Sequence, residues 1–222
     1  VKNPAVSGAT GTFTITTTDN SNSPIDTLTT VPAVTITAGV ITVADVTPAS
    51  LVAGASGAAT ATFTTANPVP ADGKFVVTFP ANFDVTGATV TAVTGQTGAA
   101  GAYTINCAAQ VCTVTRGAGA GIFTAGVTTV VFGVVKNPAV SGATGTFTIT
   151  TTTNGDAAID TLTTVPAVTI TAGVISVADV TPASLVAGAS GAATATFTTA
   201  NPVPADGKFV ITFPANFDVT GA

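Results

Sequence analysis

The sequence contains no His, Glu, Met or Trp, and its only Tyr is Tyr103. Charged residues make up 7% of its 222 residues, against roughly 25% in an ordinary soluble domain. General acid–base catalysis usually depends on His, Glu or a tuned Lys, and a zinc site needs a cluster of His, Cys or carboxylate ligands. These absences predict that the chain is not an enzyme and that it binds no cofactor.

Basic residues are equally scarce. The five Lys and Arg are spread over the whole chain, and ten Asp give a net charge of −5. Nucleic acids are bound through basic patches, so we exclude them as partners. No run of about 18 consecutive apolar residues occurs, which predicts that this stretch of chain has no membrane-spanning helix.

The chain repeats itself with a period of 134 residues. Residues 1–88 align with residues 135–222 without a gap, and seven of the 88 positions differ. Five of these differences fall in the short segment 19–24 and its copy 153–158. Such identity is typical of a tandem array, and we interpret the chain as about one and two-thirds periods cut from a longer protein.

Between clusters of turn residues, apolar and Thr side chains alternate. Ala59, Ala61 and Phe63 are separated by Thr, and Phe147 and Ile149 follow the same pattern. A period of two is typical of half-buried strands, and no apolar stripe of helical period is present. We predict an all-β, Ig-like antiparallel β-sandwich, in a tandem array with a 134-residue period and eight to ten strands per period.

Two further features concern how these strands are arranged. Residues 127–135 are apolar on both faces, which predicts a central strand. Segments 40–46 and 168–171, at the two ends of a repeat, would be sheared by tension if they were parallel and adjacent.

We place the repeat boundaries at Gly39 and Gly173, because each follows a strand end and precedes a fresh strand. Residues 1–38 are then the closing strands of one repeat, residues 39–172 a complete repeat, and residues 173–222 the opening strands of the next. No Gly/Ser or Pro linker separates them, which favours a stiff rod. The partial repeats have unpaired edges, and we expect them to pack on each other, on the complete repeat or on neighbouring chains.

Cys107 and Cys112 are the only cysteines. A hairpin register that places them opposite each other also pairs Ile105 with Val114, which keeps both pairs on one face. We therefore predict a disulfide, and with it an oxidising, extracellular setting. Two buried thiols or a shared metal ion are the alternatives, although two Cys without His make a poor metal site.

The same register places Tyr103 opposite Arg116. An ordinary surface contact between them is the simpler interpretation, and a cation–π pair is the alternative.

Calcium is the one metal that the composition leaves open, because extracellular β-rods often carry it. Asp45, Asp72 and Asp84 are weak candidates for its ligands. The chain has neither an Asp-x-Asp-x-Asp run nor a Glu for bidentate ligation. Asp72-Gly73 is also typical of an ordinary turn.

Thr accounts for 48 of the 222 residues, and it occupies the strand faces where other sandwiches carry charge. This pattern indicates a neutral, hydroxyl-rich surface that would bind by hydrogen bonds and close contact, which salt does not screen as it screens ion pairs. The simpler interpretation is that Thr supplies β propensity and solubility without charge.

Two segments carry a resemblance to a known class. They are Val-Lys-Asn-Pro-Ala-Val-Ser-Gly-Ala-Thr-Gly-Thr-Phe-Thr-Ile-Thr, from Val1 and again from Val135, and Pro-Ala-Asp-Gly-Lys-Phe-Val-Val-Thr-Phe-Pro-Ala-Asn-Phe, from Pro70 and, with Ile211, from Pro204. They resemble repeats of giant secreted proteins of algae and related protists, including diatom adhesive-trail proteins, and of bacterial large repetitive adhesins. The resemblance implies an Ig-like sandwich and a role in adhesion or fibre formation.

The function expected from these features is that of a non-catalytic structural repeat, which carries tension in a giant extracellular adhesive or fibre-forming protein. Its expected partners are neighbouring repeats of the same chain, and surfaces or polysaccharide. The alternative is a carbohydrate-binding or cell-surface lattice module of the S-layer type.

Overall fold

The computed structural model describes residues 1–95, 102–117 and 121–220, and every helix or strand within them is a β-strand. This agrees with the abundance of Thr and Val, because β-branched side chains are stiff about χ1 and fit a pleated surface. The predicted all-β class is confirmed. The chain divides into two compact units, residues 1–172 and 173–222, and each is described by itself.

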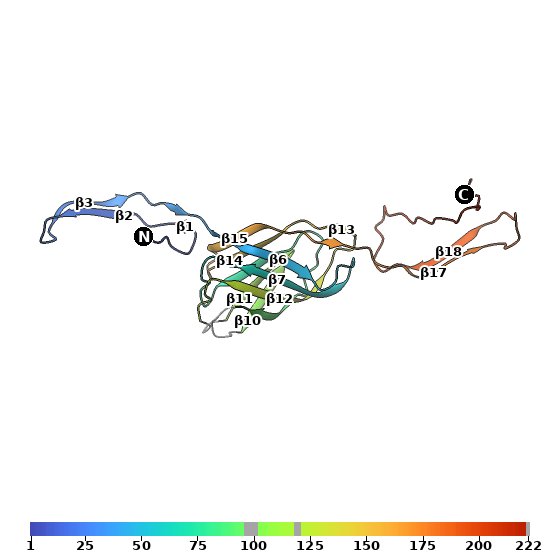
Figure 1. Ribbon diagram of the computed structural model, residues 1–222, viewed down its shortest axis with the longest axis horizontal. Helices are drawn as coiled ribbons and strands as arrows, with labels where there is room; N and C mark the ends of the chain where they lie inside the picture. Colours follow the sequence, from blue (N-terminus) through green and yellow to red (C-terminus); the bar gives the residue numbers. More distant parts are fainter. Residues whose placement is uncertain (96–101, 118–120, 221–222) are drawn as a thin grey trace. The chain divides into compact units, whose positions relative to one another are not determined.

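The first unit contains a sandwich of two sheets (Figure 1). The six-stranded sheet has the order β10 (Tyr103–Ala108), β11 (Val111–Arg116), β8 (Lys74–Thr78), β14 (Phe147–Thr152), β15 (Ala158–Val165) and β5 (Gly39–Val40). The four-stranded sheet has the order β6 (Thr42–Pro48), β7 (Ser56–Thr64), β12 (Val127–Lys136) and β9 (Thr89–Thr94). All these strands lie within residues 39–172, the segment interpreted as one complete repeat.

The two sheets share one core rich in Phe. Phe63 on β7 packs edge-on against Phe75 on β8, with ring centroids 6.0 Å apart. Phe132 on β12 packs in the same way against Phe79, which follows β8, at 5.6 Å. Because these pairs join opposite sheets, the apolar side chains that alternate with Thr in the sequence are the ones that fill the core.

β12 lies between β7 and β9, so the predicted central strand is confirmed. Its pairing with β7 shifts register between Phe132 and Val135, and Val134 adopts a left-handed φ of 59°. Such a bulge bends and twists a strand locally.

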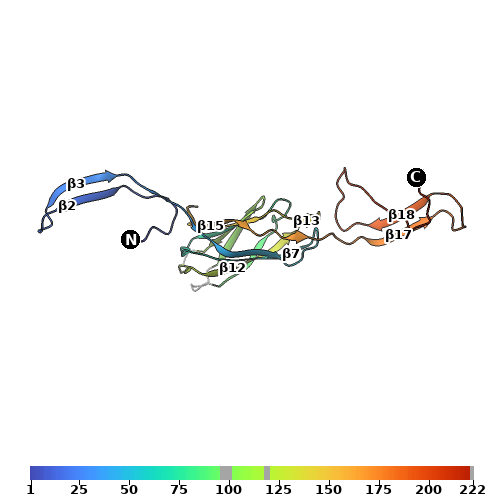
Figure 2. The same ribbon diagram turned by 45° about the horizontal axis from the view of Figure 1, so that its top comes forward.

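Residues 1–38 form two small antiparallel pairs. β1 (Gly8–Ala9) pairs with β4 (Thr35–Ile36), and β2 (Phe13–Thr18) with β3 (Pro24–Val31), as Figures 1 and 2 show for β2 and β3. In the complete repeat the copy of the first pair is β13 (Gly142–Ala143) with β16 (Thr169–Ile170). Every side chain of β2 is exposed.

The expectation that residues 1–38 pack on the complete repeat is met at Ser7, which donates to the Ala158 carbonyl, whereas the β2 side chains stay exposed. β2 has the sequence of β14, whose position beside β8 is already filled by β14 itself. The other neighbour of β8 is β11, so β8 offers no open edge to β2.

The second unit contains one hairpin, made of β17 (Ser176–Pro182) and β18 (Ala193–Thr198), and nearly all of its side chains are exposed. The expected packing of this partial repeat on other strands stays a prediction. Residues 208–212 differ from β8 at one position but form no strand. In the sandwich β8 is held between β11 and β14, and the second unit contains neither of their copies, so this sequence becomes a strand only beside its partners.

Candidate functional site

The beginning and the end of the complete repeat are joined by a parallel strand pair. β5 lies beside β15, with Gly39 opposite Asp160 and Val40 opposite Thr161. The amide of Ile41 continues the pairing by donating to the carbonyl of Thr161 at 3.2 Å. The first strand of the repeat is thus fixed to one of its last strands.

A second parallel contact involves the final residues of the repeat. Val52 forms a parallel bridge with Thr171. The amide of Thr171 donates to the carbonyl of Leu51 at 2.7 Å, and the amide of Ala53 donates to the carbonyl of Thr171 at 2.8 Å. The Thr171 hydroxyl also donates to the Leu51 carbonyl, at 3.1 Å.

Parallel pairing decides how these contacts respond to tension. When the chain is pulled from both sides, β5 is drawn toward its N-terminal end and β15 toward its C-terminal end. In a parallel pair these forces are opposed along the strand axis, so the hydrogen bonds are sheared together. The sequence predicted shear on the condition that segments 40–46 and 168–171 lie parallel and adjacent. The structure does not pair these segments with each other: β5 pairs with β15, and Thr171 pairs with Val52.

Asp160 reinforces the joint between β5 and β15. Its side chain is fully buried, and its Oδ2 accepts hydrogen bonds from the amides of Ala66 and Asn67 at 3.0 and 2.9 Å. Its Oδ1 accepts one from Asn67 Nδ2 at 2.7 Å. A buried carboxylate is stable only with such partners, and these bonds hold β15 to the segment that follows β7.

Gly39 lets the two strands approach this closely. A Cβ at this position would lie 2.1 Å from Asp160 Oδ1 and 2.5 Å from Asn67 Nδ2. Any larger residue would therefore displace the buried carboxylate or its partner. The sequence pattern marked Gly39 only as a repeat boundary and gave no sign of the role of Asp160.

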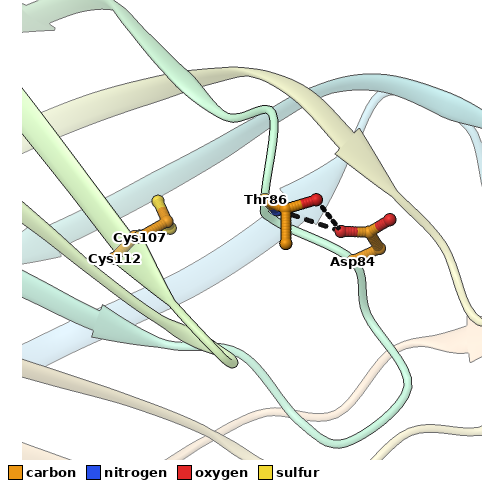
Figure 3. The surroundings of a disulfide bond; sticks show 4 residues. All are labelled: Asp84, Thr86, Cys107 and Cys112. Carbon is orange, nitrogen blue, oxygen red and sulfur yellow. Dashed lines mark hydrogen bonds between the residues drawn. A yellow bond between two sulfur atoms is a disulfide. The ribbon is translucent and has the colours of Figure 1, made fainter.

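Cys107 and Cys112 form the predicted disulfide, with their Cα atoms 4.1 Å apart (Figure 3). The register of β10 and β11 is the predicted one, since it pairs Cys107 with Cys112 and Ile105 with Val114. β10 is an edge strand of the six-stranded sheet. The disulfide therefore ties this edge to β11 and leaves no thiol for the alternatives considered from the sequence.

Arg116 corrects the interpretation of its pair with Tyr103 as a surface contact. The two residues are opposite each other, but Arg116 is only 2% exposed. Its guanidinium lies 3.6 Å above the ring of Phe123 and donates to the carbonyls of Pro70 and Gly121 at 2.9 and 2.6 Å. Burial lowers the pKa of Arg116, which Tyr103 partly opposes.

A signal for this burial was present in the sequence. Arg116 shares a strand face with Cys112 and Val114, both of which are fully buried, because side chains two apart in a strand lie on the same side.

The structure does not bring Asp45, Asp72 and Asp84 together. Asp45 accepts a hydrogen bond from the Thr47 hydroxyl at 2.7 Å, and Asp72 lies in a turn closed by the amide of Gly73 and the carbonyl of Pro70. Within residues 1–95, 102–117 and 121–220, no three His, Cys, Asp or Glu side chains are placed to share a metal ion.

The Asp84 carboxylate is instead hydrogen-bonded to a nearby residue of the same chain. Its Oδ1 accepts hydrogen bonds from the Thr86 amide at 3.0 Å and the Thr86 hydroxyl at 2.6 Å (Figure 3). These bonds lower the pKa of Asp84. The copy in the second unit, Asp218, makes the same bonds to Thr220, and its pKa is lowered in the same way, so the motif forms from local sequence alone.

The substitution Thr86→Val is expected to raise the pKa of Asp84 toward its ordinary 3.8, because it removes the hydroxyl bond that is the largest cause of the shift. A depressed carboxyl pKa stabilises the fold above the ordinary value, and this stability is lost as the pH falls through the depressed value. Carboxyl titration by NMR measures the change. Thr220→Val is the matched control and should move only Asp218; an unchanged Asp84 titration in Thr86→Val would contradict the assignment.

Thr hydroxyls pair with one another across strands. Thr62 and Thr129 on β7 and β12 are joined through their Oγ1 atoms at 3.3 Å, and Thr150 and Thr161 on β14 and β15 at 3.0 Å. These contacts satisfy hydroxyls without any charge, in keeping with a structural use of Thr on the strand faces.

Comparisons with protein families, with curated proteins and with solved structures find no match to this chain. In the part of the chain that the structure describes, there is no helix of the length and apolarity needed to cross a membrane.

Proposed function

We propose that the 134-residue repeat is a structural unit that carries tension in an extracellular adhesive or fibre-forming protein, with no catalytic role. The observation that supports this most directly is the parallel pairing of the two ends of the repeat. β5 is paired with β15, and Thr171 is paired with Val52.

This arrangement suits a chain under load. Shearing the β5–β15 pair requires its hydrogen bonds to break together, and it also requires Asp160 to leave Ala66 and Asn67. The repeat therefore resists until it fails as a whole. A repeat that fails cooperatively dissipates energy while the polypeptide itself stays unbroken, which is the property an adhesive tether needs.

The chemistry of the chain supports an extracellular setting. Disulfides such as Cys107–Cys112 persist in oxidising compartments. The strand faces carry Thr rather than charged residues, and hydrogen-bonded contacts with such a surface depend little on ionic strength.

The test is to stretch a single chain in an atomic force microscope. The one complete repeat should produce one force peak and release up to 134 residues. At roughly 3.3–3.6 Å per residue this corresponds to about 440–480 Å of contour, and to about 400 Å after the folded length is subtracted.

The disulfide provides an internal control for this measurement. It withholds the five residue steps between Cys107 and Cys112 from extension, and their Cα atoms are already 4.1 Å apart, so a reducing agent should lengthen the step by roughly 12–14 Å. A smooth stretch without a peak would reject the proposal. Two peaks of about half the length would show that the repeat contains two mechanical units.

A further inference from the structure

Within residues 1–172, a hydrogen-bonded contact joins two successive repeats. Ser7, which belongs to the closing part of one repeat, contacts Ala158, which lies at the start of β15 in the complete repeat. The amide of Ser7 donates to the Ala158 carbonyl at 2.8 Å, and the Ser7 hydroxyl donates to the same oxygen at 2.7 Å.

The sequence contains its own control for this contact. Ala139, Val140 and Ser141 are the copies of Ala5, Val6 and Ser7, in a stretch of identical sequence. The copies at 139–141 are all exposed, with Val140 at 73%, whereas Ala5, Val6 and Ser7 are half-buried.

The loop that carries Ser7 has the same shape in both copies. Gly8 pairs with Ile36, and Gly142 pairs with Ile170. The two glycines adopt left-handed φ values of 135° and 136°, a conformation that favours glycine. The loop therefore has the same conformation whether or not its Ser is hydrogen-bonded to a β14–β15 turn.

We infer that this contact is the joint of the array: the loop at residues 138–146 of each repeat is a docking surface for the β14–β15 turn, residues 153–158, of the following repeat. Ser141 would then donate to the main-chain carbonyl of that turn as Ser7 does to Ala158. The inference deepens the proposed function by naming the surface through which tension would pass between repeats.

The docking surface is firmly held by the complete repeat. Asn137, just before the loop, is 4% exposed, and its Nδ2 donates to the carbonyls of Ser50 and Val52 at 2.7 and 3.0 Å. The loop, together with residues 80–82 and Ile170, lines an open pocket of about 830 Å³. Ser141 lies on this pocket, and the proposed occupant is the turn of the following repeat.

The turn on the other side of the joint is where the two copies differ most. Residues 19–24 and 153–158 differ at five of six positions, including Pro24 in place of Ala158. The joint tolerates this change because the acceptor is a main-chain carbonyl, which every residue has. Variation in the turn can therefore alter the fit of neighbouring repeats without removing the bond.

Amide hydrogen exchange measured by NMR tests the joint in the 222-residue chain. NMR is needed because residues 1–12 and 135–146 are identical, so their peptides cannot be told apart by mass. The amide of Ser7 should exchange at least about tenfold more slowly than that of Ser141. Ser7→Ala, which removes one of the two bonds, should reduce the protection at position 7 several-fold, while the matched variant Ser141→Ala should leave it unchanged.

A lengthened chain tests the docking surface itself. When a second copy of residues 39–172 is inserted after Ala172, the first of the two Ser141 copies is followed by a complete repeat. Its amide should become as protected from exchange as that of Ser7. Equal exchange at Ser7 and Ser141 in the 222-residue chain would overturn the inference, and so would an unprotected amide at the first of the two Ser141 copies in the lengthened chain.

These outcomes are separate from those of the stretching experiment, because hydrogen exchange is measured without force. If the Ser7 amide is protected from exchange but the chain stretches without a force peak, the joint is retained and the tension-bearing function is rejected. If the chain gives a force peak but the Ser7 amide is unprotected, the tension-bearing function is retained and the joint is rejected.

Discussion

Replacing Phe147 by Ala is expected to lower the free energy of unfolding of the sandwich by about 3–5 kcal/mol. The same replacement at Phe13 is expected to change it by less than about 0.5 kcal/mol. The two residues occupy the same position in identical stretches of sequence. Phe147 is fully buried, whereas Phe13 is 46% exposed.

The difference arises from what surrounds each ring. Phe147 packs against Phe79 and Phe83, with ring centroids 5.7 Å away in both cases, so its removal leaves a cavity in a close-packed core. Phe13 lies on the exposed β2–β3 hairpin, so its removal leaves no cavity in a packed core.

Guanidinium denaturation followed by tyrosine fluorescence gives the measurement. Tyr103 is the only Tyr in the chain and lies on β10 of the sandwich, so the signal reports this part of the molecule and not the partial repeats. Equal effects of Phe147→Ala and Phe13→Ala would contradict the placement of β14 in the core.

Replacing Asp160 by Ala is expected to cost about 2–4 kcal/mol, because three donors from Ala66 and Asn67 lose their acceptor in a partly buried site. The copy of Asp160 is Asp26, which is exposed and hydrogen-bonded to Thr17. Asp26→Ala should therefore change the stability of the sandwich by less than about 0.5 kcal/mol.

The substitution Asp160→Asn removes the negative charge of the side chain but keeps its shape and its ability to form hydrogen bonds. The side-chain amide of Asn67 can rotate by half a turn and present its oxygen, so an Asn at position 160 can still make all three bonds. We expect this variant to cost less than Asp160→Ala, by about 1 kcal/mol or more. Equal losses in the two variants would show that the negative charge matters more than the hydrogen bonds.

The same variants can be stretched. Asp160→Ala should lower the force of the single peak without changing its contour length, since the number of residues released is the same. An unchanged force would mean that the β5–β15 pair is not the element that resists the load.

Features that depend on local sequence were predictable. The alternation of Ala, Phe and Ile with Thr identified β7 and β14, and the spacing of Cys107 and Cys112 gave the register of their hairpin. The apolar run at residues 127–135 identified the central strand, although nothing in it indicated the bulge at Val134.

Features that depend on partners far along the chain were not predictable. Asp26 and Asp160 have near-identical neighbours in sequence, yet one is exposed and the other buried. Residues 208–212 and β8 likewise differ at one position, and only β8 forms a strand. The difference lies in which other strands are present to pair with them, and a window of sequence does not contain this information.

The pairing of Gly39 with Asp160 also affects how quickly an unfolded repeat refolds. These positions are 121 residues apart in the chain, and the Cys107–Cys112 disulfide bridges only five of those steps. Contacts of such long range fold slowly, on a scale of roughly milliseconds to seconds for all-β domains. If the proposed function holds, a chain loaded again within that interval would resist less than at the first pull, and an array of these repeats would regain its full strength only after the unfolded repeats had refolded.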